Sequence, residues 1–196
     1  MNIIAEMYIT LLPAILAGIL NMIWCRLPVL TTINVPIDFR KNFSDGKRIF
    51  GDNKTWRGFV GMMLLGCICA VLWGFLCDTN EHLTAHNYFY ARYDNTFSYN
   101  IIIGLLIGLS YALFELPNSF IKRRLNIVPG KTHSGILKIF FIFFDQADSL
   151  FGCVLIICIF YPMTLWFYML YVFIGAATHI VINTLLYFCG LRKNMF

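Results

Sequence analysis

Two aspartates, Asp145 and Asp148, are the residues whose types and spacing most directly indicate chemistry in this 196-residue chain. Side chains three residues apart on a helix project from the same face, so these two carboxylates can share one divalent cation. Because a charged side chain at membrane depth costs about 2.5 to 3.5 kcal/mol, such carboxylates usually face an aqueous cavity. The alternative interpretation is that both acids occupy the first turn of a helix, where they cap it and complement its dipole.

A second group of candidate residues lies between Asp45 and Gly58, where charged residues alternate with glycines. Glycine permits turns that expose backbone N–H groups, and the polar side chains of this segment add donors suited to a triphosphate. The alternative is a basic loop that only contacts anionic lipid. Asp52 favours the first interpretation, because an acidic residue weakens attraction to anionic lipid but can bind a metal. The residues expected to bind substrate here are Asp52, Asn53, Lys54, Thr55 and Arg57.

A third group of polar residues lies at the end of the third apolar segment and beyond it. Its members are Glu115, Asn118, Ser119, Lys122, Arg123, Pro129, Gly130 and Lys131. Glu115 has two interpretations, a structural ion pair with Lys122 or Arg123 and a direct catalytic role. Farther along the chain, His179 and Asn183 either line the same cavity or form a hydrogen bond between helices.

The composition indicates that membrane helices hold these residues. Hydrophobic residues make up 59% of the chain, and the mean hydropathy of +0.72 is high for a soluble domain. The seven cysteines lie mainly in apolar runs without the spacing of a zinc site, so they are read as small core residues. The sequence therefore predicts an all-α integral membrane protein, with one helical domain over residues 1–196.

Five apolar segments approach or exceed the length of about 20 residues that crosses a bilayer. They are residues 3–24, 59–77, 99–120, 145–161 and 165–191. The fourth is interrupted by Asp145, Gln146 and Asp148, so its span is expected to begin near Asp145. The preceding residues 136–141 are expected to lie in the membrane interface. The first segment has neither a basic start nor a small-residue cleavage site, so it is read as a retained helix.

The basic residues predict the orientation, because Lys and Arg are retained on the cytoplasmic side. Seven of them lie in residues 26–57, five in 122–138 and two at 192–193, whereas the loop 78–98 holds only Arg92. This alternation places the N-terminus outside and the C-terminus in the cytoplasm. We therefore expect a multi-pass protein of the cell membrane whose active site forms from two cytoplasmic loops.

The sequence resembles the CDP-archaeol synthase family, membrane cytidylyltransferases related to phosphatidate cytidylyltransferase. The resemblance extends over nearly the whole chain and rests on residues 45–58, 119–123, 129–130 and 145–149. The last three segments also look like the wider cytidylyltransferase signature: a Ser then Lys-Arg, a Pro-Gly turn and an Asp-x-x-Asp pair. The chain departs from that signature at Gln146, where arginine is usual, and at residues 131–135, which only approximate its His-Gly-Gly. These departures agree with the archaeol-type branch and leave the role of His133 open.

The resemblance implies a reaction in which CTP and a membrane lipid phosphate give pyrophosphate and a CDP-activated glycerolipid, of the CDP-archaeol or CDP-diacylglycerol type. It also implies Mg²⁺ as the cofactor, and it implies no nucleic acid partner. The implied metal ligands are Asp145, Asp148 and Asp52. The implied catalytic residues are Asp145, Asp148, Lys122 and Arg123. The residues implied to bind substrate are Asp52, Asn53, Lys54, Thr55, Arg57, Asn118, Ser119, Pro129, Gly130 and Lys131.

Two other functions fit the same residues less well. A carrier or flippase for a phosphorylated lipid could use the same basic loops, but an odd number of spans without a visible inverted repeat counts against it. A scaffold that binds anionic lipid would not require Asp145 and Asp148 at membrane depth. The lipid itself stays open: the resemblance favours an ether-linked isoprenoid glycerol phosphate, while phosphatidate or a polyprenyl phosphate also fits apolar helices. The sequence does not fix base selection or the oligomeric state.

The predicted orientation can be tested by labelling single cysteines introduced at Asn42 and Asn87. In intact cells, we expect an impermeant thiol reagent to label the loop that contains position 87. Position 42 should be labelled only after the membrane is permeabilised. The opposite pattern would contradict the orientation.

Overall fold

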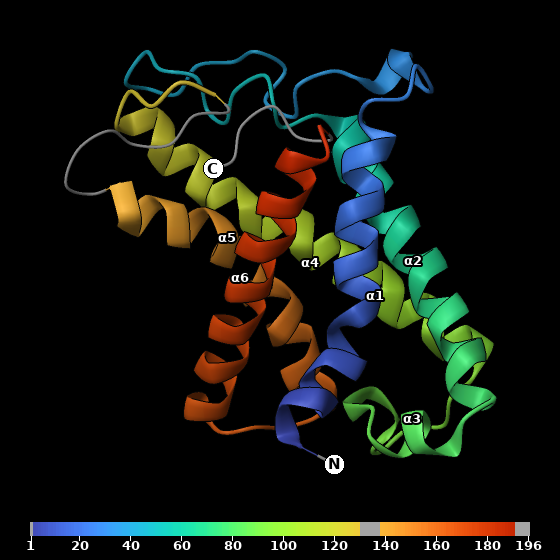
Figure 1. Ribbon diagram of the computed structural model, residues 1–196. Coiled ribbons are helices and arrows are strands. Elements are labelled where there is room, and N and C mark those ends of the chain that lie inside the picture. The colour runs from blue at the N-terminus through green and yellow to red at the C-terminus, as the bar shows by residue number, and fades with distance from the viewer. Residues whose placement is uncertain (1, 130–137, 191–196) are drawn as a thin grey trace.

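The computed structural model describes residues 2–129 and 138–190, and helices dominate it (Figure 1). Five helices are long and apolar enough to span a membrane: α1 (Ile3–Trp24), α2 (Trp56–Asp78), α4 (Phe97–Arg124), α5 (Lys138–Phe160) and α6 (Leu165–Phe188). Three short helices lie in the connections: η1 (Thr31–Ile33), α3 (Glu81–Ala85) and η2 (Tyr88–Tyr90). Within the described residues, β-type pairing is limited to two isolated bridges between α1 and α2. The prediction of an all-α protein with five membrane spans is confirmed.

Most helix starts follow directly from local sequence. Thr55, Thr96 and Thr164 precede α2, α4 and α6, and each threonine hydroxyl accepts a hydrogen bond from a backbone N–H of the first turn. Asn2 does the same for α1. Such caps satisfy N–H groups that have no partner inside the helix. Thr55, predicted to bind substrate, therefore has a structural task at the start of α2.

The start of α5 differs from the predicted span. The helix begins at Lys138, so Asp145 and Asp148 lie about two and three turns inside it. The alternative that these aspartates cap the helix is therefore wrong, because caps belong to the first turn. Figure 1 shows the first turns of α5 projecting sideways from the bundle, while its later turns run near α6.

α4 is the central helix of the bundle, since it packs against α2 on one side and α5 on the other. Glycines bring the backbones of α2 and α4 together. A Cβ atom added to Gly108 would lie 2.6 Å from the Cα of Met63, and one added to Gly66 would lie 2.6 Å from the carbonyl oxygen of Gly104. Small residues permit this close approach in membrane helices, where dispersion contacts replace the hydrophobic effect.

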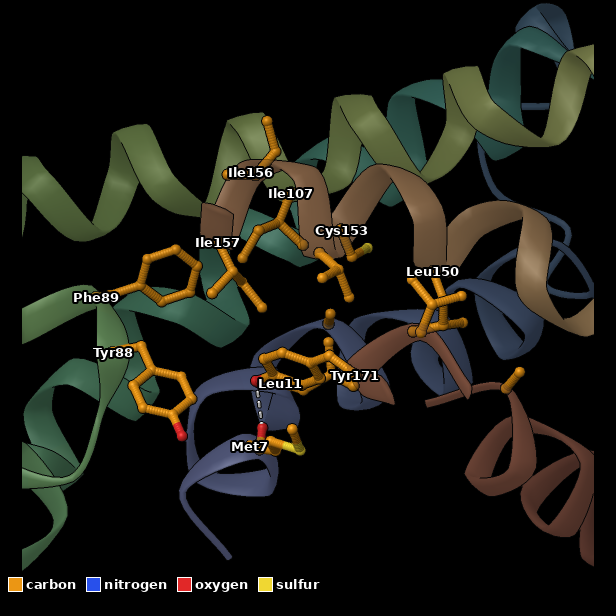
Figure 2. Packing of buried hydrophobic residues seen from close by; sticks show 14 of the residues in the cluster. Met7, Leu11, Tyr88, Phe89, Ile107, Leu150, Cys153, Ile156, Ile157 and Tyr171 are labelled. Atoms are coloured by element: carbon orange, nitrogen blue, oxygen red, sulfur yellow. Dashed lines mark hydrogen bonds between the residues drawn. The ribbon is translucent and has the colours of Figure 1, made fainter. Parts of the chain in front are cut away.

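An apolar core joins α1, η2, α4, α5 and α6 (Figure 2). Met7 and Leu11 of α1 face Tyr171 of α6, which is fully buried and donates a hydrogen bond from its hydroxyl to the carbonyl oxygen of Met7 at 2.5 Å. Tyr88 and Phe89 of η2 close the core near the N-terminus. The core therefore holds α1 against α6 at the end of the bundle where the N-terminus lies.

The α1–α2 loop and the basic residues that end α4 lie at the same end of the bundle, as the predicted sidedness requires. Figure 1 shows the α1–α2 connection beside the C-terminal ends of α4 and α6, with the N-terminus at the opposite end. Which end faces the cytoplasm stays a prediction. Asn87 is 2% exposed, so the exposed Arg92 of the same loop is the better position for the labelling test.

The close contact of α2 with α4 predicts that Gly108→Ala destabilises the protein by about 1 to 3 kcal/mol, the usual cost of overpacking. Reversible unfolding in detergent would measure it. Gly58→Ala is the matched control, because its added Cβ would lie 3.5 Å from the Cys25 sulfur, an ordinary contact. Equal stability of Gly108→Ala and the parent protein would contradict the packing described here.

Candidate active site

A cavity of about 360 Å³ lies between α1, α4, α5 and α6 and is bordered by the end of the α1–α2 loop. Part of its wall is apolar and part is charged. α1 and α6 contribute mainly apolar residues, among them Ala14, Ile15, Ile19, Ile182 and Leu186. The charged lining residues are Lys54, Glu115, Lys122, Arg123, Asp145 and Asp148. The cavity therefore combines a charged part, next to the basic loops, with an apolar part between membrane helices.

Asp145 and Asp148 face the same cavity and share one amide. Asn118 of α4 donates one hydrogen bond from Nδ2 to Asp145 Oδ1 and another to Asp148 Oδ2, both at 2.8 Å. Lys122 donates to Asp145 Oδ2 at 2.7 Å. Asp148 accepts a second bond from the backbone N–H of Ser149 at 2.6 Å, but no described basic side chain lies within ion-pair distance of it. The expectation that the two carboxylates share one face of a helix agrees with this arrangement.

Glu115 pairs with Lys54, which corrects the expected ion pair with Lys122 or Arg123. Lys54 comes from the α1–α2 loop and Glu115 from α4, so this ion pair joins the two groups of candidate residues. Burial alone would lower the pKa of Lys54, but the negative charges of Glu115, Asp148 and Asp145 raise it above its ordinary value. Lys54 is therefore held as a cation that faces three carboxylates.

Arg123 is a buried cation that has no anionic partner among the described residues. Its residue is 7% exposed, its Nε and Nη1 atoms have no hydrogen-bond partner, and no described carboxylate lies within ion-pair distance. Leaving such donors unpaired is costly, since a buried charged group loses its hydration. A guanidinium in this condition on a cavity wall suits an anionic ligand with several oxygens.

Three buried or cavity-facing polar residues join α5 to α6. Asn183 donates to the side-chain oxygen of Gln146, and His179 Nδ1 lies 3.1 Å from the carbonyl oxygen of Gln146. Both His179 and Asn183 also line the cavity, so the two interpretations of this pair hold together. Gln146 is 1% exposed, and its side-chain oxygen is satisfied by the bond from Asn183.

Asp38 organises the α1–α2 loop, and sequence reasoning missed it. Its carboxylate accepts hydrogen bonds from the backbone N–H groups of Arg40, Phe50 and Gly51 and from the Arg48 guanidinium at 2.8 and 3.3 Å. Burial alone would raise the pKa of Asp38, but the bonds from Arg48 and the backbone outweigh it and lower the pKa to about 2. The only sequence signal was an acid between apolar residues, ten positions before an arginine.

The same loop is fastened to the end of α4. Arg124 pairs with Asp45 at 2.8 Å and lies over the rings of Phe43 and Phe120, at 5.3 and 4.5 Å from their centroids. Lys47 donates from Nζ to the Arg124 carbonyl oxygen at 2.7 Å. These contacts hold Asn53 and Lys54 at the cavity.

Several predicted substrate residues lie outside the cavity lining. Asp52 is exposed and pairs with Arg48 at 3.0 Å. Arg57 is buried, and it donates to the carbonyl oxygens of Trp24 and Leu27, so it joins α2 to the end of α1. By contrast, the lining includes Asn53, Lys54, Asn118, Ser119, Lys122 and Arg123.

The Pro-Gly turn lies only partly within the described residues. The side chain of Pro129 lies 3.0 Å from the position that a Cβ on Gly51 would take. Gly51 has φ +107°, a value that favours glycine, so the α1–α2 loop can approach Pro129 and Arg123 closely. Gly130, Lys131 and His133 lie outside the described residues.

The carboxylates fit a divalent cation. Asp145 and Asp148 offer hard oxygen ligands, and the buried carboxylate of Asp148 lacks a basic partner among the described residues. No cluster of three His, Cys, Asp or Glu side chains suited to a metal occurs in residues 2–129 and 138–190. Mg²⁺ commonly uses one or two carboxylates and completes its coordination with water and substrate phosphate oxygens. Metal dependence is general among cytidylyltransferases.

Five membrane helices around a charged, partly apolar cavity define a multi-pass membrane protein with an intramembrane polar site. Its fold is similar to that of a solved structure described as "an intramembrane enzyme for archaeal membrane lipids biosynthesis". The TM-score is 0.60, at 23% sequence identity, and the similarity covers 90% of this chain and 91% of the other.

Sequence comparison identifies the family. A family model described as CarS-like CDP-archaeol synthase matches residues 1–196. CDP-archaeol synthase of Pyrococcus furiosus is 35% identical over 136 residues, 69% of either chain. The Archaeoglobus fulgidus enzyme is 33% identical over 187 residues, 89% of this chain and 96% of the relative. The chain belongs to the CDP-archaeol synthase family, which confirms the resemblance, makes the protein a nucleotidyltransferase and decides against a carrier.

The hydrogen bonds of Asp38 predict that the free energy of unfolding differs between the parent protein and Asp38→Asn, and that this difference depends on pH. Because the folded pKa of about 2 lies below the ordinary value of 3.8, the carboxylate adds stability that is complete above about pH 4. This stability is lost as the pH falls through about 2.

Denaturant unfolding in detergent should therefore show Asp38→Asn about 2 kcal/mol less stable near neutral pH. The two proteins should converge toward pH 2. Asp45→Asn is the control, since Asp45 is exposed at the edge of the loop and, besides its ion pair with Arg124, accepts one backbone hydrogen bond. A stability difference that does not change with pH would contradict the assigned role of Asp38.

Proposed function

We propose that this protein transfers the cytidylyl group of CTP to the phosphate of a membrane glycerolipid of the archaeol type. A lipid phosphate oxygen attacks the α-phosphorus, the bond from that phosphorus to the β-phosphate oxygen breaks, and pyrophosphate leaves. The products are the CDP-activated lipid and pyrophosphate, so atoms and charges balance without an additional reactant. The observation that carries the proposal is the buried Arg123 guanidinium, which has no anion among the described residues and lines the same cavity as Asp145 and Asp148.

The cations of the cavity fit a triphosphate. Arg123 would bind phosphate oxygens through its unpaired Nε and Nη1 donors. Lys122 and Lys54 are now paired with Asp145 and Glu115, and each can turn toward a phosphate when the negative charge beside it is neutralised. The residues proposed to hold the triphosphate are Asn53, Lys54, Ser119, Lys122 and Arg123.

Asp145 and Asp148 are proposed to hold Mg²⁺, which when bound supplies positive charge against the triphosphate and orients its α-phosphorus. The protein contributes position and charge, as in other phosphoryl-type transfers. Lys122, which pairs with Asp145, would stabilise charge on the leaving pyrophosphate. No side chain needs to form a covalent intermediate.

The apolar part of the cavity suits the lipid. Ile15, Ile19, Ile182 and Leu186 come from α1 and α6, which make direct contact over only a small region. A lipid that lies between these helices would place its phosphate near the charged part. Methyl-branched isoprenoid chains fit such aliphatic walls, and the family name of the relatives agrees with that substrate class.

Radiolabel transfer tests the proposed reaction. The purified protein would be incubated with Mg²⁺, an archaeol-type lipid phosphate and CTP labelled at either the α- or the γ-phosphate. Label from the α-phosphate should enter the lipid, and label from the γ-phosphate should be released as pyrophosphate. Transfer of the γ-label to lipid would indicate a kinase, and lipid labelling from neither position would contradict the proposal.

The metal role is tested by Asp145→Asn and Asp148→Asn. Asparagine keeps the side-chain shape but removes the charge that holds Mg²⁺, so turnover should fall by orders of magnitude while detergent stability persists. The double variant should be little worse than either single variant, because the two carboxylates act as one unit. Retention of more than about half of the parent turnover in both well-folded single variants would mean a loss below 1 kcal/mol in the barrier, and would rule out the metal role.

A further inference from the structure

The Asn118 amide bridges the carboxylates of Asp145 and Asp148. Both hydrogens of its amide nitrogen are used, one for each carboxylate, at 2.8 Å in both cases. Its amide oxygen is buried and has no hydrogen-bond partner among the described residues. The residue is only 5% exposed, so water does not freely satisfy that oxygen. An unsatisfied buried acceptor of this kind costs about 1 to 3 kcal/mol.

A carboxamide has two ends of nearly identical shape and opposite character, since the nitrogen donates and the oxygen accepts. With two bare carboxylates the nitrogen end is favoured, because it replaces part of the missing positive charge. With a cation between the carboxylates the preference reverses, because an N–H group would then point at positive charge. A half turn of the amide exchanges the two ends without displacing α4.

We infer that Asn118 is a further metal ligand: its amide nitrogen substitutes for the cation in the metal-free protein, and its oxygen coordinates the cation once it binds. The inference rests on the proposed function, since it concerns the same cation. It extends the oxygen ligands from two carboxylates to two carboxylates and one carbonyl-type oxygen, all suited to Mg²⁺. It also gives a role to the unsatisfied oxygen of Asn118.

The test is a titration of the purified protein with Mn²⁺ in the absence of nucleotide. Electron paramagnetic resonance measures how much of the Mn²⁺ is bound and gives the dissociation constant. Asn118→Asp keeps an oxygen for the metal but cannot donate to the carboxylates, whereas Asn118→Leu removes both functions at similar size. We expect Asn118→Leu to bind Mn²⁺ about tenfold or more weakly than the parent protein, a typical loss for groups that support a metal site. We expect Asn118→Asp to bind at least as tightly as the parent.

Thermal unfolding supplies a second readout that does not depend on activity. Without metal, Asn118→Asp should unfold at a lower temperature than the parent, because it adds a carboxylate beside Asp145 and Asp148. Mn²⁺ should then raise its unfolding temperature by more than it raises that of the parent. Asn100→Leu is the matched control, since Asn100 is a buried amide of the same helix that bonds to Tyr90 and Asn95; its Mn²⁺ affinity should equal the parent's.

The outcomes separate this inference from the proposed function. If Asp148→Asn loses Mn²⁺ but Asn118→Leu binds it as the parent does, the metal site stands and the role of Asn118 is wrong. If Asn118→Asp loses Mn²⁺ as fully as Asn118→Leu, Asn118 acts only as a donor that holds the carboxylates, and the inference is overturned. If the parent binds no Mn²⁺, or Asp148→Asn binds it equally, the metal role in the proposed function fails as well.

Discussion

Charge balance inside a membrane bundle is the constraint on which the rest of this structure depends. Among the described residues, the cavity is lined by three carboxylates (Glu115, Asp145 and Asp148) and three basic side chains (Lys54, Lys122 and Arg123). A single buried charge in such a place would be costly, whereas a set that sums to zero is tolerated. The charges are not all paired: Lys54 and Lys122 form ion pairs, whereas Arg123 and Asp148 have no ion-pair partner in the part of the chain that the structure describes. A bound metal ion would pair with Asp148, and the phosphates of CTP would pair with Arg123.

The fold serves this balance through α4. This helix carries Glu115, Asn118, Lys122 and Arg123 along its last turns, and it packs between α2 and α5. Close glycine contacts hold it against α2, and the Asn118 amide and Lys122 connect it to the aspartates of α5. Arg124 fastens the α1–α2 loop to the end of α4 through its ion pair with Asp45. Asp38 fixes the conformation of that loop through its hydrogen bonds to backbone N–H groups and to Arg48. These contacts position Lys54 to pair with Glu115, although the two residues are far apart in the sequence.

Hydrophobicity and charge sidedness were sufficient to predict the five spans and the position of the α1–α2 loop at the same end of the bundle as the basic last turn of α4, because membrane insertion depends on local composition. Asp145 and Asp148 could be predicted as a pair, since their three-residue spacing fixes a shared helix face. The start of α5 could not, because the helix continues through residues that composition alone assigns to the interface. The partners that residues find far along the chain could not be predicted either. Lys54 and Arg57 are three residues apart and both basic, yet Arg57 binds backbone carbonyl groups and Lys54 faces the cavity. The fold buries Asp38, and its position between two apolar residues was too weak a signal to predict that.

The central claim is that the cavity binds CTP through Arg123 together with a divalent cation at the two aspartates. Calorimetric titration of the detergent-purified protein with CTP, with and without Mg²⁺, tests it most directly. We expect CTP binding to require Mg²⁺ and to weaken at least about tenfold, or about 1.4 kcal/mol, in Arg123→Gln, while Arg92→Gln at the opposite end of the bundle should bind CTP as the parent does. CTP binding of equal strength without Mg²⁺, or in Arg123→Gln, would contradict it.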